Sequence, residues 1–74
     1  MNGNLLKRVM KEKGFSQTSL AEALGVERQT VWKYLNGKVD IVTKRIKQII
    51  EVLGITDTAL IMDIFLEEND GKDN

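Results

Sequence analysis

A short stretch of the sequence, residues 28–36, concentrates side chains that donate hydrogen bonds. At helical spacing, one side of this stretch carries Arg28, Gln29, Trp32, Lys33 and Asn36. That side has no Asp or Glu, whereas a helix face that meets only water usually mixes both charges. Arg and Lys can donate to guanine O6 and N7, and Gln can pair with adenine N6 and N7. The pattern predicts a surface that reads base edges of double-stranded DNA, chiefly through Arg28, Gln29 and Lys33.

Trp32 is the unusual member of this set. It could contact a thymine methyl group, or lie against sugar and phosphate, and we keep it among the base-reading candidates. On a helical wheel, however, it also borders the apolar Leu35. We favour the interpretation in which Trp32 covers the edge of the hydrophobic core.

Several residue types that enzymes and metal sites use are missing. The sequence has no Cys and no His, which excludes disulfides, thiolate or imidazole metal sites and a histidine base. It has no Gly-rich phosphate loop and no paired carboxylates in a pocket-like pattern. The acidic run at residues 67–70 lacks the alternating ligand spacing of a calcium loop. We therefore expect no enzyme activity, no cofactor and no metal.

The zero net charge hides a strong asymmetry along the chain. Residues 1–50 carry ten Lys or Arg and four acids, a net charge of +6. Residues 51–74 carry one base and seven acids, a net charge of −6. Such a distribution favours contact of the first part with a polyanion and keeps the second part away from it.

Nothing in the sequence indicates a membrane protein. No apolar run approaches the roughly 18 residues of a membrane span. The first ten residues mix charges into an apolar stretch and are followed by no cleavage site of small residues, so they do not resemble a signal peptide. We expect a cytoplasmic protein with no membrane partner.

The elements that must position the polar face are short helices. The 74 residues suffice for one domain, and the absence of Pro favours an all-α chain. Glycine follows four of the apolar-periodic stretches, as a residue of positive φ does at a helix end: Gly14, Gly25, Gly37 and Gly54. The predicted helices span about residues 4–13, 16–24, 27–36, 43–53 and 57–68. Ser16 is a good N-cap and Glu27 a poor one. Residues 69–74 are predicted to form a flexible polar tail.

The second and third predicted helices form a distinctive pair. Only Gly25 and Val26 join them, so they must cross steeply as in a helix-turn-helix motif, at about residues 16–36. Ala21 supplies the small residue that the crossing needs. The apolar wedge between the helices would be filled by Leu20, Leu24, Val26, Val31 and Leu35.

Residues 15–38, FSQTSLAEALGVERQTVWKYLNGK, resemble the Cro/C1-type (XRE-like) helix-turn-helix of phage repressors and their bacterial relatives. The resemblance covers about residues 4–55. It implies a compact five-helix lambda-repressor-like domain, here residues 1–68, that binds operator DNA as a dimer. Because these 74 residues hold no second domain, it implies a small Cro-like regulator, acting in the bacterial nucleoid or the cytoplasm of an infected host.

The resemblance also implies roles for individual residues. Gln17 opens the second helix and would hydrogen-bond a phosphate. Arg28, Gln29 and Lys33 match the base-reading positions, and Thr30 would add a phosphate or base contact. The DNA backbone would be braced by Asn36, Lys38 and Lys44. Many family members bury an Arg–Glu pair between the first and third helices, whereas the matching positions here are the apolar Met10 and Leu35. Packed apolar groups can replace such a pair without loss of stability.

The last predicted helix, residues 57–68, is apolar on two sides. One side can cover the domain's own core, and the other needs a partner, most simply a second copy. The predicted dimer interface consists of Ala59, Met62, Phe65 and Leu66. The sequence does not settle which face of this helix meets the partner.

Together these features predict a regulator of transcription, namely a repressor, that binds an inverted-repeat operator as a homodimer. Two alternatives use the same fold. One is the DNA-binding antitoxin of a toxin–antitoxin pair, with the toxin docked on the last helix or the acidic tail. The other is an adaptor that binds a protein partner and no DNA.

Overall fold

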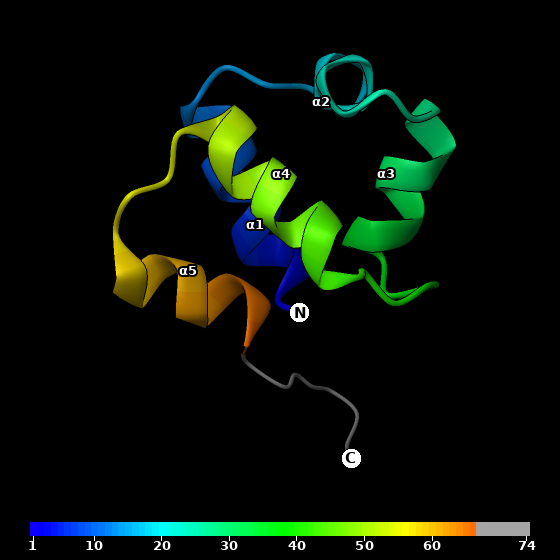
Figure 1. Ribbon diagram of the computed structural model, residues 1–74. Helices are drawn as coiled ribbons and strands as arrows, with labels where there is room; N and C mark the ends of the chain where they lie inside the picture. Colours follow the sequence, from blue (N-terminus) through cyan, green and yellow to red (C-terminus); the bar gives the residue numbers. More distant parts are fainter. Residues whose placement is uncertain (67–74) are drawn as a thin grey trace.

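Five α-helices follow one another along residues 1–66, the part of the chain that the computed structural model describes, and this part contains no strand (Figure 1). They are α1 (Gly3–Glu12), α2 (Gln17–Leu24), α3 (Arg28–Leu35), α4 (Thr43–Leu53) and α5 (Thr58–Phe65). The predicted all-α, five-helix class is therefore confirmed. Helix α5 ends at Phe65, short of the predicted boundary, and the predicted tail at residues 69–74 lies outside the described residues.

Local side-chain hydrogen bonds determine where three of the helices begin. Ser16 Oγ accepts from the backbone N–H of Ser19, and Ser19 Oγ accepts from that of Ser16, so the predicted Ser16 cap is confirmed. Asn2 caps α1 by accepting from Leu5 N–H, and Asp57 caps α5 by accepting from Ala59 N–H and Leu60 N–H, each without a reciprocal bond. The residues before α3 and α4 make no side-chain cap bond, as expected for Glu27.

The turn between α2 and α3 depends on one glycine. Gly25 has φ +75°, a left-handed conformation that side chains with a Cβ atom rarely adopt. This conformation lets Val26 N–H donate to Ala21 O at 3.0 Å and closes the end of α2. The other three glycines predicted at helix ends also have positive φ, so the predicted division of the chain is confirmed.

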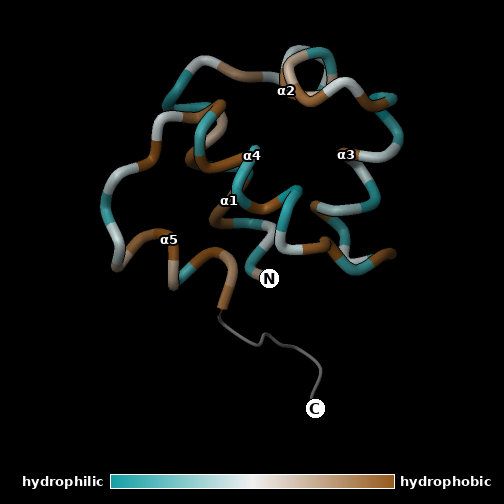
Figure 2. Tube along the Cα trace, viewed as in Figure 1, coloured by the Kyte–Doolittle hydropathy of each residue, from teal (hydrophilic) through white to brown (hydrophobic). Residues whose placement is uncertain are grey.

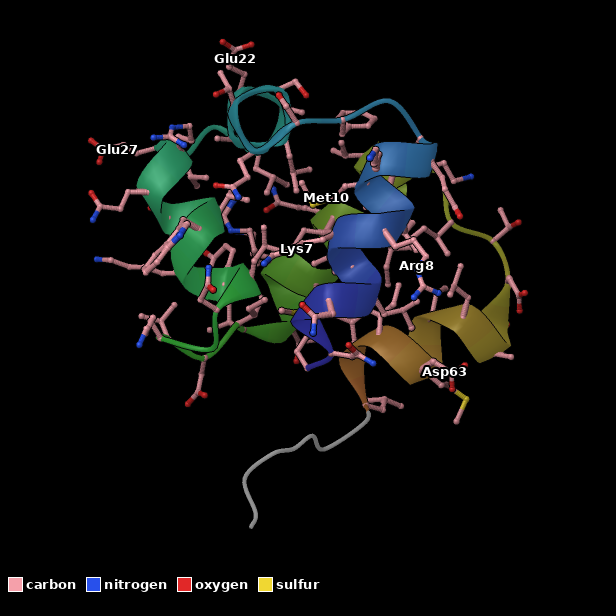
Figure 3. All side chains as sticks on the ribbon, turned by 180° about the vertical axis from the view of Figure 1, so that it is seen from behind. Lys7, Arg8, Met10, Glu22, Glu27 and Asp63 are labelled. Atoms are coloured by element: carbon pink, nitrogen blue, oxygen red, sulfur yellow. The ribbon has the colours of Figure 1, made fainter. Side chains whose placement is uncertain are left out.

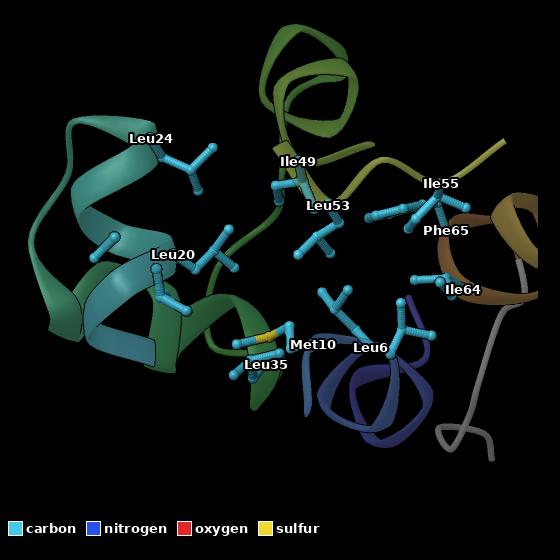
Figure 4. Packing of buried hydrophobic residues seen from close by; sticks show 13 residues of the cluster. Leu6, Met10, Leu20, Leu24, Leu35, Ile49, Leu53, Ile55, Ile64 and Phe65 are labelled. Carbon is cyan, nitrogen blue, oxygen red and sulfur yellow. The ribbon is translucent and has the colours of Figure 1, made fainter. Parts of the chain in front are cut away.

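The core lies between the helices and is entirely apolar in the described residues (Figure 4). Helices α1 and α4 run through the middle, with α3 on one side and α5 on the other (Figures 1 and 3). Coloured by hydropathy, α5 is brown along most of its length (Figure 2). The buried residues are Leu6, Val9, Met10, Leu20, Ala21, Leu24, Val31, Leu35, Ile49, Leu53, Ile55, Ile64 and Phe65. None of the helices of residues 1–66 has the length and apolar character to span a membrane.

Met10 and Leu35 lie in this core and are drawn next to each other in Figure 4. They occupy the two positions at which the family resemblance implies an ion pair. Both side chains are buried, so the connection between α1 and α3 is apolar in this chain.

The start of α1 is held by two close backbone contacts that sequence reasoning missed. Asn2 N–H donates to Ile64 O of α5 at 2.6 Å. A Cβ atom added to Gly3 would overlap the carbonyl oxygen of Leu35 at the end of α3. The N-terminus of α1 therefore contacts α5 and the end of α3 through the backbone, and position 3 has no room for a larger residue.

Candidate nucleic-acid interface

Helix α3 has a buried side and an exposed side. Val31 and Leu35 point into the core and are at most 6% exposed. The exposed side carries the predicted set of Arg28, Gln29, Trp32, Lys33 and Asn36. Packing of the two apolar residues against α1 and α2 thus leaves the donor-rich side facing solvent, where it can meet a ligand as large as a DNA groove.

The structure corrects the interpretation of Trp32. Its side chain is 42% exposed, and it is not part of the core cluster. It borders a shallow surface hollow that Arg28 and Gln29 also line. Trp32 therefore belongs to the exposed polar face rather than to the edge of the core, because the neighbouring helices leave it uncovered.

The end of α3 is fixed by its own hydrogen bonds. Asn36 Nδ2 donates to Trp32 O at 2.8 Å, so this side chain closes the last turn of the helix. Lys38 N–H donates to Lys33 O at 2.9 Å and holds the following turn against the helix end. The exposed Lys38 side chain consequently starts from an ordered backbone, next to the donor-rich face.

Gln17 is the first residue of α2 and is partly buried. Its Oε1 is buried without a hydrogen-bond partner in the described part of the chain. A phosphate accepts hydrogen bonds, so the group that could reach it is the amide Nε2 of this side chain. Thr30 is also partly buried, and its backbone N–H donates to Glu27 O at 2.9 Å.

Lys44 is exposed in the first turn of α4, where it lines a second hollow with Val42, Arg45 and Gln48. Arg45 has a different role from its neighbour. Its Nη1 donates to Leu24 O at 3.1 Å and to Gln48 Oε1 at 2.8 Å. Sequence reasoning missed this contact, because it joins residues 21 positions apart.

The basic and acidic residues divide along the chain, although two acids, Glu22 and Glu27, lie on the α2–α3 side of the domain. Within residues 1–66, every Lys and Arg lies in residues 1–50, while the acids Glu51, Asp57 and Asp63 lie beyond them. Figure 3 shows Asp63 on α5, across the molecule from Glu27 at the head of α3. No cluster of potential metal ligands occurs within residues 1–66. The exposed side of α3 itself carries Arg28 and Lys33 and no acid, so it is the surface more suitable for a polyanion.

Helix α5 divides its apolar residues between the core and the surface. Ile64 is fully buried and Phe65 is 9% exposed, so Phe65 packs in the core of its own chain. This removes Phe65 from the predicted dimer surface, because its side chain already has partners. Met62 and Leu66 are 50% and 66% exposed, and Ala59 is exposed beside them.

Comparisons with known proteins agree with this geometry. The family model described as helix-turn-helix matches residues 6–60. A relative from Bacillus subtilis (strain 168), named "SPbeta prophage-derived uncharacterized HTH-type transcriptional regulator YonR", is 34% identical over 61 residues. The match covers 82% of this chain and 56% of the relative, so the chain spans little more than half of that protein's length. No solved structure gives a significant match.

Proposed function

This chain belongs to the helix-turn-helix family of Cro/C1 (XRE) type, and on that premise we propose that it binds an inverted-repeat DNA operator as a dimer and represses transcription. The observation that carries the proposal is the two-sided character of α3. Its apolar residues are buried in the core, and its exposed side offers Arg, Gln, Lys, Asn and Trp with no acid. A helix of this kind fits the width of the major groove.

Sequence readout is assigned to the first turns of α3. Arg28 would donate to guanine O6 and N7, and Gln29 would pair with adenine. Lys33 would reach a further base one turn along the helix. Trp32, exposed over the hollow that it shares with Arg28 and Gln29, would contact a thymine methyl group or the adjacent sugar.

Register on the duplex is assigned to residues around α3. Gln17 would donate its amide to a phosphate beside the start of α2, and Lys38 and Lys44 would contact phosphates on the opposite side. Thr30 and Asn36 are the other two residues that would contact phosphates. Asn36 keeps an N–H for this purpose, because its amide nitrogen carries two hydrogens and donates just one bond within residues 1–66, to Trp32 O.

Dimerisation is assigned to the exposed apolar residues of α5, namely Ala59, Met62 and Leu66. They are apolar, they are exposed in the structure of residues 1–66, and they lie close together along the helix. A twofold axis at this surface would place two copies of α3 in successive major grooves, about 34 Å apart. The acids of α5 would lie away from the DNA, which lowers repulsion.

Repression follows from occupancy, since a dimer on an operator that overlaps a promoter blocks polymerase. The site of action would be the cytoplasm, where bacterial and phage DNA is transcribed. The exposed α5 surface also fits a protein partner, and such a surface is what the antitoxin and adaptor alternatives require.

A selection experiment tests the proposal. Duplexes enriched from a random pool are labelled and sedimented with the protein at two salt concentrations. We expect two protomers on an inverted repeat and an affinity that falls steeply as salt rises. If no sequence is enriched and the protein stays monomeric, the operator proposal is wrong, and a protein that docks on α5 becomes the better hypothesis.

A further inference from the structure

One acidic residue lies directly before the donor-rich side of α3. Glu27 is the residue before α3 and is exposed. Figure 3 shows its side chain extending outward where α3 begins. No hydrogen bond or ion pair engages its carboxylate within residues 1–66, not even with the adjacent Arg28. Within residues 1–66, the carboxylate therefore acts on the fold only through its charge near the N-terminus of α3.

A cap hydrogen bond does not explain the choice of Glu at this position. Ser, Thr, Asp and Asn are the side chains that stabilise a helix start, and Ser16, Asn2 and Asp57 do so at three other helices of this chain. Glu27 makes no such bond at α3. A recognition helix enters the major groove with its N-terminal residues toward the base edges, which places this carboxylate among phosphates that repel it.

We propose that Glu27 is a specificity-determining residue that accepts a hydrogen bond from the N4 amino group of cytosine in the operator. The assignment rests on the proposed function and adds one base pair to its readout, next to the pair that Arg28 reads. Glu and Asp accept from cytosine N4, and a bond to an ionised acceptor is stronger than one between neutral groups.

The carboxylate would discriminate among bases mainly by repelling those that present acceptor atoms in the major groove. Repulsion from the phosphates weakens binding to every sequence alike. Guanine and thymine present acceptor oxygens in the major groove, which a carboxylate also repels, whereas cytosine N4 offers a donor. Adenine N6 offers a donor beside the N7 acceptor, so adenine is the second choice. A glutamine at position 27 would complement both groups of adenine.

The test compares Glu27→Gln and Glu27→Ala with the unmodified chain on a single-base series of the selected operator. We expect the unmodified chain to bind the cytosine form about tenfold more tightly than the thymine or guanine form, in line with one good base contact. Glu27→Gln should shift the preference at that base pair to adenine. Glu27→Ala should lose the preference there and retain it at all other positions.

Glu22→Gln is the matched control. Glu22 is an exposed acid on α2 of the same motif (Figure 3). Its replacement removes the same charge, so it should raise affinity slightly and equally for all bases. Thermal melting should show both Glu27 variants folded, because no cap bond is lost.

The outcomes separate this inference from the proposed function. If the unmodified chain enriches an operator but Glu27→Gln gains affinity equally on every base, as Glu22→Gln does, Glu27 is only a repulsive charge and the inference is wrong. An operator series with no cytosine preference beside the Arg28 contact would also overturn it. A chain that enriches no operator overturns the proposed function and the Glu27 assignment with it.

Discussion

The guanidinium of Arg45, on α4, donates a 3.1 Å hydrogen bond from Nη1 to the carbonyl oxygen of Leu24, the last residue of α2. The last carbonyl groups of a helix have no partner within it and carry partial negative charge. The cation of Arg45 satisfies one of them directly before the turn at Gly25. A side chain of α4 thereby stabilises the corner that orients α3.

Replacement of Arg45 by Met should lower the free energy of unfolding by about 1–2 kcal/mol, because a charge-assisted hydrogen bond is lost while most of the aliphatic packing remains. Urea denaturation measures the change. Lys47→Met is the control, since Lys47 is exposed on the same helix and its side chain makes no hydrogen bond to any of the described residues 1–66. Equal losses in the two variants would show that the contact with Leu24 O contributes nothing.

Gly3→Ala should destabilise the domain by about 1–3 kcal/mol, the usual cost of overpacking. The new Cβ would overlap the backbone oxygen of Leu35, which cannot rotate away. Because Ala normally stabilises a helix relative to Gly, any net loss reports the clash. Thermal melting of Gly3→Ala and of the exposed neighbour variant Asn4→Ala makes the comparison. A stabilised Gly3→Ala chain would contradict the close approach of α1 to the end of α3.

Arg28→Ala and Lys38→Ala should weaken DNA binding in different ways. Loss of Arg28 should cost about 1–3 kcal/mol on the selected operator and relax the preference at one base pair. Loss of Lys38 should weaken all sequences alike and reduce the salt dependence by about one phosphate contact. Titrations on a single-base operator series at several salt concentrations distinguish the two. If Arg28→Ala lost the same affinity on every operator of the series, a base-reading role for Arg28 would be excluded.

Met62→Lys should convert the proposed dimer to a monomer without unfolding it. Met62 is 50% exposed, so a charge there meets water in the monomer and would be buried in a dimer. Analytical ultracentrifugation and thermal melting measure the two effects. Val39→Lys is the control, because Val39 is a similarly exposed apolar residue in the loop between α3 and α4. A Met62→Lys chain that still dimerises would place the interface elsewhere.

Local sequence determined most of the fold of this protein. Glycines with positive φ, the Ser16 cap and the spacing of apolar residues act over a few positions, so the helices before α5 begin and end within about one residue of the prediction. The short connection between α2 and α3, three residues from Gly25 to Glu27, likewise dictates a steep crossing of the two helices. The donor-rich side of α3 follows from the same periodicity, because burial of Val31 and Leu35 leaves only one side free.

Tertiary structure decided the features that depend on which segments meet. Helix α5 is apolar nearly all round, so a helical wheel could not separate the buried Phe65 from the exposed Met62; the position of α1 did so. Trp32 is exposed because the neighbouring helices leave it uncovered. The bond of Arg45 to Leu24 O and the contact of Gly3 with Leu35 join residues far apart in the chain, and no local pattern encodes such distances.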